Sequence, residues 1–305
     1  MLALVIRKCQ DSLYPPPLEI YQRQDMNEVE LTALATVLLV LVGGAQVVVL
    51  LGQRHQQRLD WAEMYRRRWI ELKGDWATVV FLGRRASDYY QIAHHETLKQ
   101  LRDATKASSN DVASSWAQAS VRNVCGMLSD LCSRILQGHI QVRDVYPIFG
   151  TELLRQGAPL RVLLDGNDSY LKCYGRMGPS EEESRHDNLR REMITWLTCH
   201  DGIRRRCLIM IDLLWAEASR LEDLPPYEII GAADAKSKTG HLNRARLRSE
   251  AFRLNRWWSW RRSLRLSRFL RYSEWRRFPW SRGLSKKRQK KLDEAWTKRY
   301  LSPYH

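Results

Sequence analysis

The sequence predicts an all-α protein that has one N-terminal transmembrane helix, a cytoplasmic helical bundle and a basic, partly helical C-terminal tail. Three observations support this. An apolar stretch of 22 residues, Leu31 to Gly52, contains no charged side chain. After it, apolar residues recur at intervals of three and four, the spacing of one helix face, and almost never alternate with polar ones. The excess positive charge is confined to the last quarter of the chain.

The stretch 31–52 has the length of a membrane span. At about 1.5 Å per residue it reaches about 33 Å as a helix, enough to cross a hydrocarbon core of about 30 Å. A helix also satisfies its own backbone polar groups, which lipid requires. A buried core helix is the less favoured alternative because it would have to be apolar on every side. Gly43, Gly44 and Ala45 allow close helix approach and Gln46 can hydrogen-bond, so a homo-oligomer through this helix is one expectation.

The flanks of the span predict its orientation. In the twenty residues before it only Arg23 is basic, whereas the twenty after it contain five arginines: Arg54, Arg58, Arg66, Arg67 and Arg68. An excess of Lys and Arg marks the cytoplasmic side. We therefore expect a single-pass protein of the cell membrane, with its N-terminus outside and its C-terminal domain in the cytoplasm. The lipid bilayer is then its first partner.

Residues 1–30 are expected to form a short disordered N-terminal segment. It contains three consecutive prolines, Pro15 to Pro17. Acidic Glu28 and Glu30 precede the apolar stretch where a signal peptide carries basic residues, so a cleaved signal is disfavoured. Either Met1 or Met26 serves as the start.

Residues 53–223 predict a cytoplasmic all-α domain. Helices are expected near 54–104, 111–138, 145–156, 180–200 and 203–222 from their apolar spacing and from capping signals. Leu160 to Leu164 fits a strand or a helical turn. Residues 224–240 contain Pro225-Pro226, Gly231 and Gly240, and are expected to be a linker.

Residues 241–305 form the basic, aromatic-rich tail. Between His241 and Lys291 there are 18 Lys and Arg against Glu250 and Glu274, and the remaining 32 basic and 32 acidic residues of the chain cancel. Arginine and tryptophan suit the headgroup zone of a membrane, so anionic lipid headgroups are the favoured partner. Nucleic acid is the alternative, because arginine pairs with phosphates and aromatic rings stack on bases. A solvated or protein-packed basic helix is the third interpretation. The candidate binding residues are Arg253, Arg256, Trp257, Trp258, Trp260, Arg261, Arg262, Arg265, Arg268 and Trp275.

One spacing points to catalysis. Arg134 and His139 have the Arg-x4-His spacing of HEPN-type ribonucleases, all-α domains in which the two residues face the scissile phosphate. The similarity covers six residues, and Ile135 stands where those motifs commonly carry a polar residue. A chain this rich in arginine produces such a spacing by chance, so a surface pair is favoured.

Other motifs of catalysis, phosphate-loop binding or metal binding are not found in the sequence. No two of the six cysteines have Cys-x-x-Cys spacing, so neither a metal nor a cofactor is expected. The favoured function is a non-catalytic scaffold, adaptor or effector at the inner face of a prokaryotic membrane, the prokaryotic source being inferred from the compact, linker-poor chain. The alternative is a membrane-tethered nucleic-acid-binding protein or ribonuclease.

Overall fold

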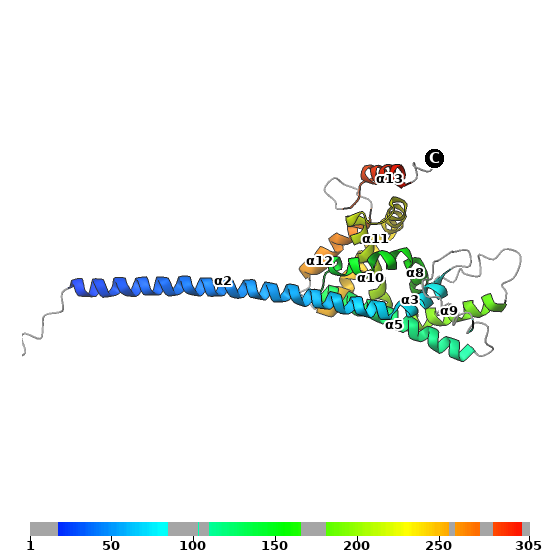
Figure 1. Cartoon of the computed structure of the whole chain (residues 1–305), viewed down its shortest axis with the longest axis horizontal. Helices are drawn as coiled ribbons and strands as arrows, with labels where there is room; N and C mark the ends of the chain where they lie inside the picture. The colour runs from blue at the N-terminus through cyan, green and yellow to red at the C-terminus, as the bar shows by residue number, and fades with distance from the viewer. Residues whose placement is uncertain are drawn as a thin grey trace, which may run out of the picture. The chain divides into compact units, whose positions relative to one another are not determined.

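The computed structural model describes residues 18–84, 103, 110–165, 181–255, 260–274 and 283–300. Over these residues the chain is helical and contains no strand, which confirms the all-α prediction. The chain divides into two units, residues 1–57 and 58–305. Figure 1 shows the helices of each unit.

The described residues of the first unit form the N-terminal part of helix α2 (Leu18–Glu71). Among the described residues, one segment is long and apolar enough to cross a membrane, and it lies in this helix. Its large apolar side chains are exposed, with Leu39 at 75% and Val40 at 68% of their full accessibility. Such exposure over several turns is unfavourable in water and is relieved in lipid.

Helix α2 begins before the span, so the expectation of a disordered segment is wrong for residues 18–30. These residues contain neither proline nor glycine, and they extend the helix backwards from the apolar stretch at little cost in propensity. Pro17 directly precedes the helix. The rest of the predicted segment, residues 1–17, lies outside the described residues.

The core of the second unit is built around α3 (Lys73–Gly83), α5 (Asn110–Gln137) and α10 (Asp201–Leu221), which pack against one another through α5. The apolar stripes that predict α5 and α10 are buried, except that Ile203 is half-buried and Leu221 is 46% exposed at the two ends of α10. The buried side chains are Val121, Val124, Leu128, Leu131 and Ile135 on α5, and Cys207, Met210, Ile211, Leu214 and Ala218 on α10. The predicted boundaries 111–138 and 203–222 agree with the structure to within two residues.

The single helix expected near 145–156 is wrong in detail. The chain forms three short pieces instead: α6 (Val142–Val145), a π-helical turn η1 (Tyr146–Gly150) and α7 (Thr151–Arg155). Pro147 lacks a backbone N–H, which disfavours a continuous α-helix there. Residues 160–164 belong to helix α8 (Gly157–Asp165), so the helical alternative holds for them. Helix α9 (Glu181–Cys199) matches its prediction.

The helix expected over 54–104 is interrupted at Leu72 and ends at Gly83. A side chain at position 83 would overlap the backbone carbonyl of Pro159, so this glycine lets α3 lie directly against α8. Most of the remainder, residues 85–102, lies outside the described residues.

The predicted linker over 224–240 is instead the first half of α11 (Pro226–Asn255). Pro226 occupies the first helical position, where its missing N–H costs nothing. Gly240 also lies within this helix. A side chain at position 240 would overlap the carboxylate of Glu274, so glycine allows the two segments to lie close together. Proline and glycine therefore mark a helix start and a close contact in this segment, not a flexible connection.

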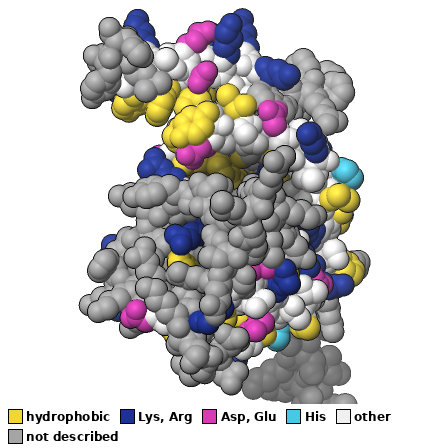
Figure 2. Space-filling model, turned by 90° about the vertical axis from the view of Figure 1, so that its right-hand side faces the viewer, with side chains coloured by type: hydrophobic (Ala, Val, Ile, Leu, Met, Phe, Trp, Pro, Cys, Tyr) yellow, Lys and Arg dark blue, Asp and Glu magenta, His cyan; other side chains and the backbone are white. Residues whose placement is uncertain are grey.

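The basic C-terminal segment packs onto the rest of the second unit. Its described parts are α12 (Trp260–Phe269), the 3₁₀ turn η4 (Leu270–Ser273) and α13 (Lys286–Tyr300). Helices α12 and α13 contact α11, and η4 contacts both α10 and α11 (Figure 1). Over α13, at the top of Figure 2, Lys and Arg side chains lie above a group of hydrophobic side chains. The tail is partly helical as predicted, and it belongs to the same unit as the bundle.

Candidate functional site

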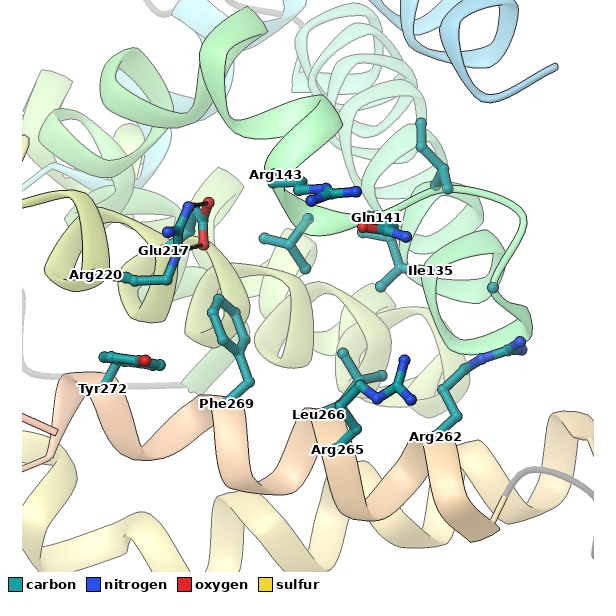
Figure 3. A pocket seen from close by; sticks show the side chains of 13 residues that line it. Ile135, Gln141, Arg143, Glu217, Arg220, Arg262, Arg265, Leu266, Phe269 and Tyr272 are labelled. Carbon is teal, nitrogen blue, oxygen red and sulfur yellow. Dashed lines mark hydrogen bonds and ion pairs between the residues drawn. The ribbon is translucent and has the colours of Figure 1, made fainter. Parts of the chain in front are cut away.

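A pocket of about 450 Å³ opens between α5, α6, α10, α12 and η4 (Figure 3). All of these elements belong to the second unit. Its lining combines guanidinium groups with apolar and aromatic side chains. The lining residues are Ile135, Gly138, Ile140, Gln141, Val142, Arg143, Glu217, Arg220, Arg262, Arg265, Leu266, Phe269 and Tyr272.

Helix α12 contributes one wall. Arg262, Arg265, Leu266 and Phe269 have the spacing i, i+3, i+4 and i+7, which places them on one side of a helix. In sequence this stripe looks like an apolar face interrupted by two arginines. In the structure the same stripe lines a pocket, so basic and apolar side chains face the same space. Ser263, Ser267 and Leu270 are the side chains that this segment buries against protein.

The charge on the pocket wall is predominantly positive. Four arginines line it against one carboxylate, that of Glu217. Glu217 is already engaged by Arg220, which donates from Nε at 2.8 Å and from Nη2 at 2.5 Å. This hydrogen-bonded pairing raises the pKa of Arg220. The pocket therefore offers its other arginines no unengaged carboxylate.

Arg262 closes the C-terminal end of α5. Its Nη1 donates to the carbonyl of Gln137 and, at 3.4 Å, to that of Leu136. These carbonyls lack partners within the helix, and a cation there also meets the negative end of the helix dipole. Gly138, which follows Gln137 in the chain, has φ +84°, and a side chain there would overlap the Arg262 guanidinium. Burial lowers the pKa of Arg262, and the positive charge of Arg265 lowers it further.

Arg265 lies one turn away from Arg262 and is exposed. Within the described part of the chain it has no hydrogen bond or ion pair, although its charge acts on Arg262. Across the pocket, Nε of Arg143 lies 3.8 Å from Oδ1 of Asp144. The Asp144 carboxylate also has other partners. Its Oδ2 lies 3.4 Å from Nε of Arg58 and accepts a hydrogen bond from the backbone N–H of Gln141. Two weakly compensated guanidiniums, Arg143 and Arg265, thus face one space (Figure 3).

The structure divides the predicted tail residues into groups. Arg262 and Arg265 line the pocket. Arg253, Trp260, Arg261 and Arg268 are exposed and do not line it, and Trp260 retains 67% of its accessibility. Arg256, Trp257, Trp258 and Trp275 lie outside the described residues. The exposed residues of α12 that do not line the pocket, Trp260, Arg261 and Arg268, are called its outer flank below.

The ribonuclease spacing falls where α2 meets α5. Nε of Arg134 lies 3.2 Å from Oδ2 of Asp130, and its guanidinium carbon lies 3.8 Å from the ring centre of Trp61. The Tyr65 hydroxyl donates to the same carboxylate oxygen at 2.5 Å. Burial and the Asp130 carboxylate both raise the pKa of Tyr65. Arg134 is therefore engaged in packing between helices.

His139 follows the end of α5. Its amide donates to the carbonyl of Arg134 at 3.0 Å, as part of the helix C-cap, and its side chain is exposed. This backbone hydrogen bond is the link between Arg134 and His139; in the described part of the chain, no side-chain hydrogen bond or ion pair joins them.

The described residues offer little support for a metal site or for reactive buried thiols. They contain no cluster of three His, Cys, Asp or Glu that fits a metal ion. Cys125, Cys132 and Cys207 are buried free thiols. Burial raises the pKa of Cys132 and of Cys207, which disfavours the reactive thiolate.

The residues that complete the pocket from other helices, Arg143, Glu217 and Arg220, are not among the predicted site residues. Phe269 and Tyr272 lie on the apolar helical stripe that the sequence of the tail shows, but they are not among the predicted binding residues either. Arg143 and Arg220 carry no such signal, because only tertiary packing brings α6 and α10 to α12.

Comparison of the chain with protein-family models, with curated proteins and with solved structures gives no match.

Proposed function

We propose that this protein is a single-pass, membrane-anchored, non-catalytic scaffold, adaptor or effector at the cytoplasmic face of a prokaryotic membrane, and that its basic C-terminal segment contacts anionic lipid headgroups. The observation that carries this is the outer flank of α12. Trp260 and two arginines, Arg261 and Arg268, are exposed on a helix whose other side is held by protein.

The chemistry of the outer flank suits an anionic bilayer surface. Each basic side chain near such a surface contributes about 1 kcal/mol, and tryptophan favours the headgroup region. An anchor in the same bilayer holds the segment close by, which reduces the entropy cost of this contact. Leu270 is buried in protein and cannot insert into lipid. The attraction between the outer flank and the bilayer is therefore mainly electrostatic, and Trp260 supplies the apolar contribution.

The alternative function, nucleic-acid binding or cleavage, draws on the same arginines. Its catalytic form is less favoured, since Arg134 is engaged by Asp130 and Trp61. Its binding form predicts a salt dependence like that of lipid binding, so competition between the two ligands is the more decisive test.

The test uses the full chain in zwitterionic nanodiscs, because the C-terminal segment packs on the bundle. Flotation with phosphatidylglycerol vesicles measures lipid binding. The triple variant Trp260→Ser, Arg261→Gln, Arg268→Gln should lose vesicle binding. The control Arg66→Gln, Arg67→Gln removes two exposed arginines from α2 and should retain it.

Excess single-stranded RNA decides between the two readings. If the lipid proposal holds, RNA leaves the vesicles bound, and Trp260→Ser alone weakens vesicle binding more than RNA binding. If RNA strips the protein from the vesicles and Trp260→Ser weakens both equally, nucleic acid takes the place of lipid. Phosphodiester cleavage that is lost on His139→Ala would establish the ribonuclease form.

A further inference from the structure

We propose that the pocket between α6, α10 and α12 binds a phosphomonoester of a small molecule, with its phosphate between Arg143 and Arg265 and its apolar or aromatic body against Phe269 and Leu266. None of the three outer-flank residues lines this pocket, so the proposal does not rest on the lipid contact proposed above.

Uncompensated positive charge is the first argument. Arg262 and Arg265 repel each other, Arg265 has no partner within the described residues, and the one lining carboxylate is held by Arg220. Like charges that share a space are costly unless an anion lies between them. The pocket wall therefore favours a negatively charged occupant.

The type of anion follows from the donors. Guanidinium groups present several N–H donors in a planar fork that matches phosphate oxygens. A phosphomonoester has three terminal oxygens and nearly two negative charges, so it can engage guanidiniums from two walls at once. A single carboxylate has two oxygens and one charge, and would leave one of the arginines uncompensated.

The apolar wall requires more than a phosphate ion. Ile135, Leu266 and Phe269 line the same space, and the Phe269 ring points into it (Figure 3). A volume of about 450 Å³ falls in the range of small-molecule sites, about 300–1,000 Å³. An occupant with a charged head and a flat or apolar body covers both kinds of wall.

This chemistry has two sources. A nucleoside monophosphate carries its phosphate on a flat base-bearing body, and phosphatidic acid carries a phosphomonoester on an apolar body. Both satisfy the proposal, and the experiment identifies which of them competes better.

The experiment uses the full chain in phosphatidylcholine nanodiscs, with a fluorescent methylanthraniloyl derivative of AMP as the probe. We expect saturable binding that unlabelled AMP displaces, that adenosine does not displace, and that inorganic phosphate displaces only at higher concentration. Arg265→Gln should weaken binding about tenfold or more, because one charge-assisted contact is lost.

The matched control is Arg66→Gln, which removes the same charge from an exposed position on α2 that does not line the pocket. It should leave the probe's affinity within about twofold of the wild type, since surface charge is screened. Arg265 is exposed and has no hydrogen bond or ion pair within the described residues, so we expect its replacement to leave the fold intact. Circular dichroism and the denaturation midpoint confirm this for both variants.

A second arm replaces part of the phosphatidylcholine by phosphatidic acid. Loss of probe binding there, but not with an equal charge of phosphatidylglycerol, identifies the lipid phosphomonoester as the source. Unchanged probe binding identifies the soluble ester. The proposal is overturned if no saturable binding occurs, if adenosine competes as well as AMP, or if Arg265→Gln and Arg66→Gln behave alike. None of these results bears on vesicle binding by the outer flank, so the two proposals fail separately.

Discussion

The ammonium group of Lys236 on α11 lies 3.2 Å from Oδ1 of Asp212 on α10, and both side chains are buried. Lys236 also donates to the Asp212 backbone carbonyl at 2.8 Å, and Nη1 of Arg161 lies 3.5 Å from the same carboxylate oxygen. Burial lowers the pKa of Lys236, while the Asp212 charge opposes that shift. This pair fixes α11, and with it the attachment of α12, to the centre of the bundle.

Asp212→Asn should destabilise the protein strongly. The substitution leaves the buried Lys236 cation without its carboxylate, which costs about 3–5 kcal/mol of unfolding free energy. Denaturant titration of the full chain in neutral detergent measures the loss. The control is Asp165→Asn, which removes the exposed carboxylate on the other side of Arg161 and should cost less than about 1 kcal/mol. Equal losses would show that the buried pair has no special weight.

Stability should fall in mild acid because of His186. Its Nε2 lies 2.9 Å from the Phe81 carbonyl, and burial lowers its pKa to about 4. The unfolded chain takes up this proton below about pH 6.5, whereas the folded chain does so only near pH 4. The stability that depends on a neutral His186 is thus fully present above about pH 6.5. As the pH falls towards 4, the free energy of unfolding decreases by up to about 3 kcal/mol.

The variant His186→Gln isolates this effect, because glutamine can donate to the same carbonyl but does not titrate. The difference in unfolding free energy between wild type and variant should shrink as the pH falls through that window. A constant difference for His186→Gln would refute the assignment.

Gly138→Ala should destabilise the end of α5. Position 138 has φ +84°, and a Cβ there would overlap the Arg262 guanidinium. Backbone strain of this kind costs about 1–3 kcal/mol, and the displaced Arg262 should also weaken binding in the pocket. Gly126→Ala is the control: the new Cβ meets no atom within 4 Å and should stabilise the helix by about 0.5–1 kcal/mol. Thermal unfolding distinguishes the two opposite signs.

Val40→Arg should impair membrane insertion. A charge at mid-span costs about 2.5–3.5 kcal/mol on insertion scales, and Val40 is exposed, so no protein core is disturbed. Carbonate extraction of membranes and a cytoplasm-dependent reporter fused after His305 give the readout. Leu59→Arg, at an exposed apolar side chain beyond the span, should insert normally. A wild-type fusion that is inactive in the cytoplasm would reverse the predicted orientation.

Gly44→Ile combined with Gln46→Leu should reduce self-association in the membrane. Small residues permit close helix approach, and a polar side chain contributes about 0.6–2 kcal/mol across such an interface. A side chain at position 44 meets no other atom of the chain within 4 Å, so the folding of one copy is unaffected. If the amount of crosslinked oligomer is unchanged, the helix serves only as a membrane anchor.

The sequence predicts helices well where one apolar stripe faces one core, as on α5, because burial and periodicity then agree. The sequence predicts less well where one residue type fits two different structural roles. Pro226 resembles a breaker but begins a helix. Arg262 resembles an interruption of an apolar face but caps α5 and lines a pocket. The pocket itself was not predictable, because Arg143 and Arg220 reach it only through the packing of helices distant in sequence.

The two flanks of α12 have an electrostatic consequence. Arg261 and Arg268 lie four and three positions from Arg265, the spacing of neighbouring side chains on a helix, and the Debye length at physiological ionic strength is about 8 Å. A dianion held by Arg265 would therefore reduce the positive potential of Arg261 and Arg268 beside it. By reciprocity, a charged surface at the outer flank would weaken the hold on the dianion by the same factor. Because salt screens this coupling, a dissolved dianion and a charged surface would compete for helix α12 more strongly at low ionic strength than at high ionic strength.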